Sequence, residues 1–181
     1  DRIGDEFGVQ YILKAGQNEY QRIKEMKATN ATFILPLNFP LAQDVEDPND
    51  ARFVSLGDMK HWELAPTMPA SFEKAGVPFC LTSADLKSVS QFGSALKKAM
   101  EYGLTETAAL DALTIIPAKT IGASDMVGSL EVGKLANFLV TTGPIFQEKS
   151  TLLQNWIQGI KYTIKEDAGS INGTYPISVS S

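Results

Sequence analysis

The stretch that decides the fold is residues 77–85, VPFCLTSAD, in which a short apolar run leads directly into an aspartate. Val77–Thr82 has the composition of a buried β-strand, and Gly76 marks its upstream boundary. In α/β folds and barrels, ligands bind at the edge where the parallel strands end. Asp85 follows such a strand end and is therefore the first candidate functional residue.

Two apolar runs upstream have the same character. Residues 9–13 and 32–35 are predicted strands, and residues 18–28 between them carry apolar side chains at three- and four-residue spacing, which indicates an amphipathic helix. Strand, helix and strand at this spacing predict a βαβ unit with a right-handed crossover. A nearly continuous apolar run such as 32–35 is typical of a parallel strand covered on both faces. The sequence therefore predicts an α/β fold.

The remaining segments are predicted to be helical at first and then to form short strands. A long polar loop is predicted from residue 38 to about 59, and such loops are usually functional or disordered. The predicted helical segments are 70–74, 90–102, 106–113 and 117–121. The predicted strands that follow are 139–141, 151–157 and 162–164, with one more β-like piece at 175–179 in a polar tail. These short segments indicate a small antiparallel sheet.

Composition excludes several classes of protein. The 181 residues are 44% hydrophobic and 20% charged, as in a soluble globular protein, and no apolar run is long enough to span a membrane. A net charge of −5 without a basic stripe argues against a nucleic-acid partner. The single cysteine cannot form an internal disulfide, and the single histidine rules out a two- or three-histidine metal site made by this chain alone. The compartment stays open.

Two charged residues lie at predicted strand ends. Asp85 has a functional interpretation, because a carboxylate there is costly to desolvate unless it binds a metal or a hydrogen-bond donor, and a structural one, as the cap of the helix that follows. Lys14 follows the first predicted strand and would point toward the same mouth as Asp85 if the two strands are parallel neighbours. It could orient a carboxylate or a substrate, or it could simply be solvated.

Three other features have simpler interpretations. His61 is predicted to be a loop or surface histidine, although a ligand role stays open. Cys80 is predicted to be a small buried apolar residue, because a nucleophilic cysteine would need His61 as its base. The acidic loop 44–50 lacks the spacing and central glycine of a calcium loop and is interpreted as solvated charge.

The segment 104–140, LTETAALDALTIIPAKTIGASDMVGSLEVGKLANFLV, resembles the C-terminal signature of the amidohydrolase superfamily, in particular its imidazolonepropionase-like branch. The matching pieces are Ala109-Leu110, Thr114 to Ala118, Gly122, Val127 to Leu130, Gly133-Lys134 and Ala136-Asn137-Phe138. Asn137 stands where most members have aspartate.

The resemblance implies roles for the strand ends. Residues 77–85 resemble the eighth barrel strand of the family, whose terminal aspartate binds the metal and takes a proton from the attacking water, so both roles fall on Asp85. Residues 9–13 and 32–35 resemble the sixth and seventh strands. The family often has a metal-binding histidine after the sixth strand, and here that position is occupied by Lys14-Ala15-Gly16.

The resemblance also implies a domain organisation. A (β/α)8 barrel needs about 250 residues, so residues 1–122 are expected to be the C-terminal part of a barrel, about strands six to eight, from a longer protein. Residues 123–165 are expected to contribute strands to the family's small β-sandwich. Residues 166–181 are expected to be a polar tail that begins a further β module.

The implied activity is metal-dependent hydrolysis of C–N bonds in small or cyclic substrates, by a metal-bound hydroxide with Asp85 as proton shuttle. The expected cofactor is a divalent metal, zinc by resemblance, in the full-length protein and not in this chain alone. The expected partners are a small-molecule substrate and either a second copy or the N-terminal part of the protein. The alternative is a binding or scaffold protein that kept the fold and lost its metal, since the histidine near Lys14 is absent.

Overall fold

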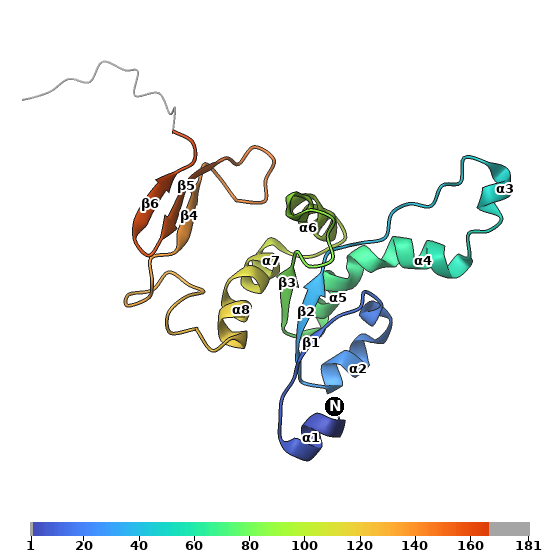
Figure 1. The fold of residues 1–181 in the computed structure, drawn as a ribbon, viewed down its shortest axis with the longest axis horizontal. Coiled ribbons are helices and arrows are strands. Elements are labelled where there is room, and N and C mark those ends of the chain that lie inside the picture. The colour runs from blue at the N-terminus through green and yellow to red at the C-terminus, as the bar shows by residue number, and fades with distance from the viewer. Residues whose placement is uncertain (1, 167–181) are drawn as a thin grey trace, which may run out of the picture. The chain divides into compact units, whose positions relative to one another are not determined.

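The computed structural model describes residues 2–166, and the β-like piece predicted at 175–179 lies outside this range. Its contacts divide the chain into two units, Asp1–Glu131 and Val132–Ser181, which are described separately (Figure 1). None of the helices in the described part is long and apolar enough to cross a membrane.

A three-stranded parallel sheet forms the centre of the first unit. Its strands are β1 (Ile12–Lys14), β2 (Thr32–Pro36) and β3 (Phe79–Thr82), in the order β1-β2-β3 (Figure 1). The 3-10 helix η1 (Glu19–Arg22) and α2 (Ile23–Ala28) connect the first two strands. This arrangement confirms the predicted α/β class and the strand–helix–strand order.

The first strand is shorter than predicted. Its pairing with β2 begins at Ile12 opposite Thr32 and continues through Lys14 opposite Ile34. Since Thr32 is the first residue of β2, the residues before Ile12 have no partner on that strand, and Val9 is 49% exposed. The predicted strand at 9–13 was therefore wrong at both of its ends.

The segment predicted as a loop at 38–59 ends in a helix. It contains α3 (Pro48–Ala51) and the start of α4 (Leu56–Leu64), and η2 (Ala65–Thr67) and α5 (Met68–Ala75) follow. The Ser55 hydroxyl accepts a hydrogen bond from the Asp58 backbone N–H at 3.0 Å and so caps α4. Its apolar residues are mostly exposed, so no amphipathic pattern marked this helix in the sequence.

The other helices of the first unit agree with the predicted positions, except for one at the start of the described chain. They are η3 (Val89–Gln91), α6 (Phe92–Glu101), α7 (Glu106–Leu113) and α8 (Ile115–Thr120), together with the unpredicted α1 (Arg2–Phe7). Both α7 and α8 contact β3 (Figure 1).

The aromatic part of the core lies on one face of the parallel sheet. Phe72 of α5 is fully buried and makes edge-on ring contacts with Phe33 of β2, at 5.2 Å between centroids, and with Phe79 of β3, at 6.1 Å. Along β2, Phe33 and Leu35 are buried, whereas on the other face Pro36 is buried and Thr32 and Ile34 are only partly covered. Among the described residues, the expected cover of both faces is therefore complete on one face of β2 and partial on the other.

A close contact explains one glycine of the sequence signature. Gly128 has φ +98°, and a Cβ there would lie 2.7 Å from the Cβ of Ala118 and 3.1 Å from the carbonyl oxygen of Thr114. The signature residue Gly128 therefore packs directly on α8 and on the residue that precedes it. The conformation and the lack of space both require glycine at this position.

Replacing Gly128 by alanine is expected to lower the free energy of unfolding by roughly 2–4 kcal/mol, from left-handed strain plus overpacking. Gly122 is the matched control, because it has φ +70° in the same unit and a Cβ added there would meet no atom within 4 Å. Gly122→Ala should cost only the backbone strain, roughly 1 kcal/mol. Denaturant unfolding of both variants checks this, and equal losses would show that the contact with Ala118 has no energetic weight.

The second unit contains a small antiparallel sheet, as predicted. Its strands are β4 (Phe138–Thr141), β5 (Leu152–Ile157) and β6 (Ile160–Thr163), in the order β4-β5-β6. Gln158 and Gly159 form the two-residue connection between β5 and β6, both with positive φ, as a tight hairpin turn requires. Phe138 and Trp156 are paired across β4 and β5, and their rings stack at 5.3 Å.

Candidate active site

The candidate site lies at the C-terminal edge of the parallel sheet. Because all three strands run in one direction, their last residues, Lys14, Pro36 and Thr82, gather at this edge, and Pro36 is paired with Thr82. The backbone N–H of Ala15 donates to the carbonyl oxygen of Ile34 at 2.9 Å, which extends the pairing one residue beyond β1. Asp85 follows β3 at the same edge.

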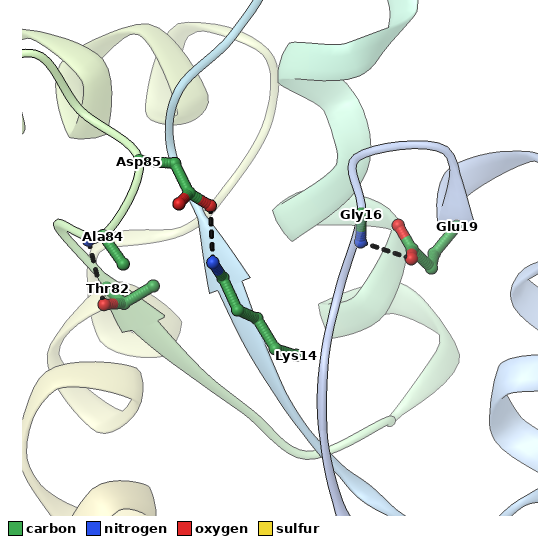
Figure 2. Close-up of polar contacts among 6 residues, drawn as sticks. All are labelled: Lys14, Gly16, Glu19, Thr82, Ala84 and Asp85. Atoms are coloured by element: carbon green, nitrogen blue, oxygen red, sulfur yellow. Dashed lines mark hydrogen bonds and ion pairs between the residues drawn. The ribbon is translucent and has the colours of Figure 1, made fainter.

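The structure joins the two predicted strand-end residues in an ion pair. Lys14 Nζ lies 2.6 Å from Asp85 Oδ2, and the two side chains are 48% and 45% exposed. A dashed line marks this contact in Figure 2. Lys14 ends β1 and Asp85 follows β3, and these two strands are not neighbours, because β2 lies between them. The two residues therefore meet at this edge although the condition of the prediction, neighbouring strands, is not met, because the lysine side chain reaches across β2. With both groups half exposed, the pair contributes little to stability, so its position is more informative than its energy.

The backbone around Asp85 directs its side chain toward Lys14. The Ala84 N–H donates to Thr82 Oγ1 at 3.1 Å (Figure 2). The Leu86 N–H donates to the Ser83 carbonyl at 3.3 Å, so the chain turns sharply after β3. Asp85 has φ +68°, a left-handed conformation that aspartate tolerates better than most residues. A strained residue at a strand end is typical of functional sites.

The interpretation of Asp85 as a helix cap is wrong. The next helical segment, η3, is capped by Ser88, whose hydroxyl accepts a hydrogen bond from the Ser90 backbone N–H at 3.3 Å. Asp85 lies three residues before this cap and contacts Lys14 instead. Its carboxylate is therefore engaged by a cation at the sheet edge and not by a helix terminus.

The loop after β1 is held by its own carboxylate. The Gly16 backbone N–H donates to Glu19 Oε1 at 2.6 Å (Figure 2). This contact closes the turn between β1 and η1 directly after Lys14. It fixes the strand end from which Lys14 extends.

A pocket of about 630 Å³ adjoins Asp85. Four parts of the first unit line it: the segment 37–42 after β2, Trp62 of α4, the segment 85–87 after β3, and the helical region 91–98. The last part contributes Gln91, Ser94, Ala95 and Lys98, whose spacing places them on one helix face. Sequence reasoning did not identify this pocket, because its lining comes from four separate segments that no local pattern joins.

His61 lies on α4, not in a loop, and is partly buried. Its Nδ1 is 3.1 Å from the Tyr20 hydroxyl, within hydrogen-bonding distance, and the two rings stack with centroids 6.1 Å apart. The structure thus gives His61 a packing partner, and neither of these contacts involves Asp85.

Cys80 is a buried strand residue, as predicted. It is 7% exposed, and its Sγ lies 3.6 Å from Thr120 Oγ1. Burial raises the pKa of the Cys80 thiol, and the contact with Thr120 offsets this only in part. A raised pKa makes the thiolate scarce near neutral pH, so the thiol is not activated as a nucleophile.

We therefore expect Cys80 in the folded protein to react with iodoacetamide at least roughly tenfold more slowly than free cysteine at pH 8, with a rate that rises as the pH increases. Peptide mapping by mass spectrometry follows this residue alone. Unfolding in denaturant should restore the rate of a free thiol. Fast labelling that does not depend on pH would instead indicate an exposed, activated thiol.

The acidic loop holds its own backbone. Asp44 Oδ1 accepts from the Glu46 N–H at 3.2 Å, and Asp47 Oδ1 accepts from the Asn49 N–H at 2.8 Å, at the start of α3. Over residues 2–166, no group of three or more His, Cys, Asp or Glu side chains is placed to hold a metal ion.

The model of one protein family matches more than half of the chain. Residues 67–174 match the sequence model described as the amidohydrolase family. No curated protein sequence matches the chain. Among solved structures, an amidohydrolase from Thermotoga maritima MSB8 has 26% identity and a TM-score of 0.68, with 88% of this chain and 38% of that chain covered.

Two further solved structures share the fold at lower identity. A prolidase complexed with N-methylphosphonate-L-proline has 18% identity and a TM-score of 0.60, with 86% of this chain and 40% of that chain covered. A Xaa-Pro dipeptidase with bound methionine has 18% identity and a TM-score of 0.52, with 90% and 47% covered. The chain thus spans less than half the length of each of these structures.

Proposed function

Because this chain belongs to the amidohydrolase family, we propose that it is the C-terminal part of a hydrolase that cleaves C–N bonds in small or cyclic substrates. The observation that carries the proposal is the Lys14–Asp85 ion pair at the C-terminal edge of the parallel sheet, beside a pocket large enough for a small molecule. The imidazolonepropionase-like branch stays a prediction.

The proposed architecture is an arc of a (β/α)8 barrel in which β1, β2 and β3 are strands six, seven and eight. The coverage of less than half of each of the three solved structures named above supports it. So does the sheet itself, because the β2 face opposite Phe72 is only partly covered, and Ile12 at the β1 edge is 49% exposed. Under this proposal the rest of the barrel covers both, and β4 to β6 join a small β-sandwich.

In the proposed chemistry Asp85 transfers protons. Its carboxylate accepts a proton from a water molecule as the water oxygen bonds to the substrate carbonyl carbon. The same proton then moves from Asp85 to the leaving nitrogen as the C–N bond breaks, which restores the carboxylate. Lys14, bound to Oδ2 at 2.6 Å, orients the carboxylate so that Oδ1 is available for the transfer.

Amidohydrolases generally use divalent metals, but the described residues do not form a metal site. Asp85 is a single carboxylate, its Oδ2 is held by an ammonium group, and no suitable group of ligands lies in the described part of the chain. A catalytic metal usually needs three protein ligands. The proposed proton transfer is therefore derived from Asp85 and Lys14 alone.

The role of Lys14 is tested by Lys14→Met in the full-length protein, assayed for amine release from a panel of small cyclic and linear amides. Loss of the orienting cation should lower kcat roughly tenfold to a hundredfold with a smaller change in KM. Lys24→Met, at an exposed lysine of α2, is the control and should keep full activity. An unchanged kcat in Lys14→Met would remove Lys14 from the site.

A second candidate is a non-catalytic barrel that binds a ligand. It is favoured by Lys14 at the end of β1, where the resemblance leads us to expect a metal-binding histidine. Instead of binding a metal, this lysine forms an ion pair with Asp85. Metal analysis of the full-length protein, together with the same amide panel, separates the candidates. A stoichiometric divalent metal or measurable hydrolysis rules out the scaffold, whereas the absence of both supports it.

A further inference from the structure

The pocket beside Asp85 has an unbalanced charge. Three charged side chains line it, Asp85, Lys87 and Lys98, and Asp85 is the sole acid among the described residues that do so. Its carboxylate is already engaged by Lys14 at 2.6 Å. Within residues 2–166, the ion pairs of the structure involve neither Lys87 nor Lys98. The pocket therefore presents two cations that its own walls do not neutralise.

The two lysines approach the pocket from different elements. Lys87 belongs to the segment that follows β3, and Lys98 lies in α6 on the helix face that lines the pocket. Lys98 Nζ lies 5.9 Å from the ring centroid of Phe39, so this cation is placed against an aromatic wall. Lys98 is also partly buried, which limits its screening by solvent and salt.

The other walls are mainly apolar. Phe39, Leu41 and Leu86 line the pocket, and Trp62 contributes an indole that is 40% exposed. Such surfaces favour a flat or branched hydrocarbon group, which loses contact with water when it binds. An inorganic anion would neutralise the lysines but leave the apolar side chains exposed to water. A cationic ligand would be repelled by the lysines.

We infer that this pocket binds an organic monocarboxylate that carries an aromatic or branched apolar group. The carboxylate lies at Lys98 and Lys87, and the apolar group packs on Phe39 and Trp62. The reacting carbonyl then faces Asp85. The inference rests on the proposed function for that last point, whereas binding of the anion itself does not depend on catalysis.

The probes are N-acetyl-L-phenylalanine, which carries the carboxylate, and N-acetyl-L-phenylalaninamide, which has nearly the same shape without the charge. Calorimetric titration uses the full-length protein with Asp85→Asn and Lys14→Met together, so that no probe is consumed and no cation beside the pocket is left unpaired by the change. The acid should bind at least roughly tenfold more tightly than the amide, because a charge-assisted contact is lost in the amide. Acetate, which lacks the apolar group, should bind more weakly than either.

Variants locate the contact. Lys98→Met should weaken binding of the acid roughly tenfold and leave the amide unchanged, since only the charge differs between the two probes. Lys87→Met should act in the same direction, and the exposed Lys24→Met should bind both probes like the parent. Trp62 fluorescence should change on binding, and this change should disappear in Trp62→Phe.

Three results would overturn the inference: equal affinity for acid and amide, unchanged acid binding in Lys98→Met, or no binding of either probe. Failure of the proposed function is a different result. If the acid binds as described but the parent protein hydrolyses no amide, the pocket is an anion-binding site and the hydrolase proposal fails alone.

Discussion

Replacing Asp85 by asparagine in the full-length protein should lower kcat for amide hydrolysis roughly 100- to 10,000-fold, the range expected when a proton-transfer group is lost. Asparagine has the same shape and tolerates positive φ, so the strained backbone at +68° should be retained. The amide cannot accept and return the proton. Steady-state kinetics on the best substrate of the panel measures the effect.

A matched control separates chemistry from charge. Asp125 is an exposed aspartate of the first unit, and Asp125→Asn makes the same change in net charge away from the pocket. It should keep the activity of the parent, and the thermal unfolding of both variants should resemble that of the parent. Equal kcat in Asp85→Asn and in the parent would remove Asp85 from the chemistry.

Phe72→Ala is expected to have the largest effect on stability, a loss of roughly 3–5 kcal/mol, as for other buried phenylalanines. Its ring is fully buried against β2 and β3, in contact with Phe33 and Phe79, so truncation removes a contact that joins α5 to the sheet. Denaturant unfolding, followed by near-ultraviolet circular dichroism, measures the change.

Phe53 provides the control for this prediction because it is 85% exposed in the same unit. Phe53→Ala should change the free energy of unfolding by less than roughly 0.5 kcal/mol, as at other exposed positions. A loss in Phe72→Ala no greater than that in Phe53→Ala would show that the Phe72 contacts do not hold the sheet.

Local patterns in the sequence were sufficient for most of the fold. The run that ends at Thr82 formed a buried strand because its residues are apolar and β-prone, and the antiparallel hairpin formed at Gln158-Gly159. Local patterns did not predict the elements whose ends or packing depend on residues far away in the sequence. The end of β1 is set by Thr32 on another strand, and α4 has a Ser55 cap but no apolar stripe.

The candidate site was predictable only in part. A charged residue after a strand end could be located from sequence, which is why Asp85 and Lys14 were both identified. Their ion pair spans β2, and strand order is a property of the folded sheet. The pocket residues Trp62, Lys87 and Lys98 are far apart in sequence and polar or exposed, so no local pattern joined them.

The central claim is that β1, β2 and β3 form one arc of a closed barrel whose mouth carries Lys14 and Asp85. An experimental structure of the full-length protein tests it directly. The account predicts that the outer edges of β1 and β3 each pair with a further parallel strand and that the Lys14–Asp85 pair faces the barrel interior. Free outer edges, with the pair turned toward bulk solvent, would contradict it.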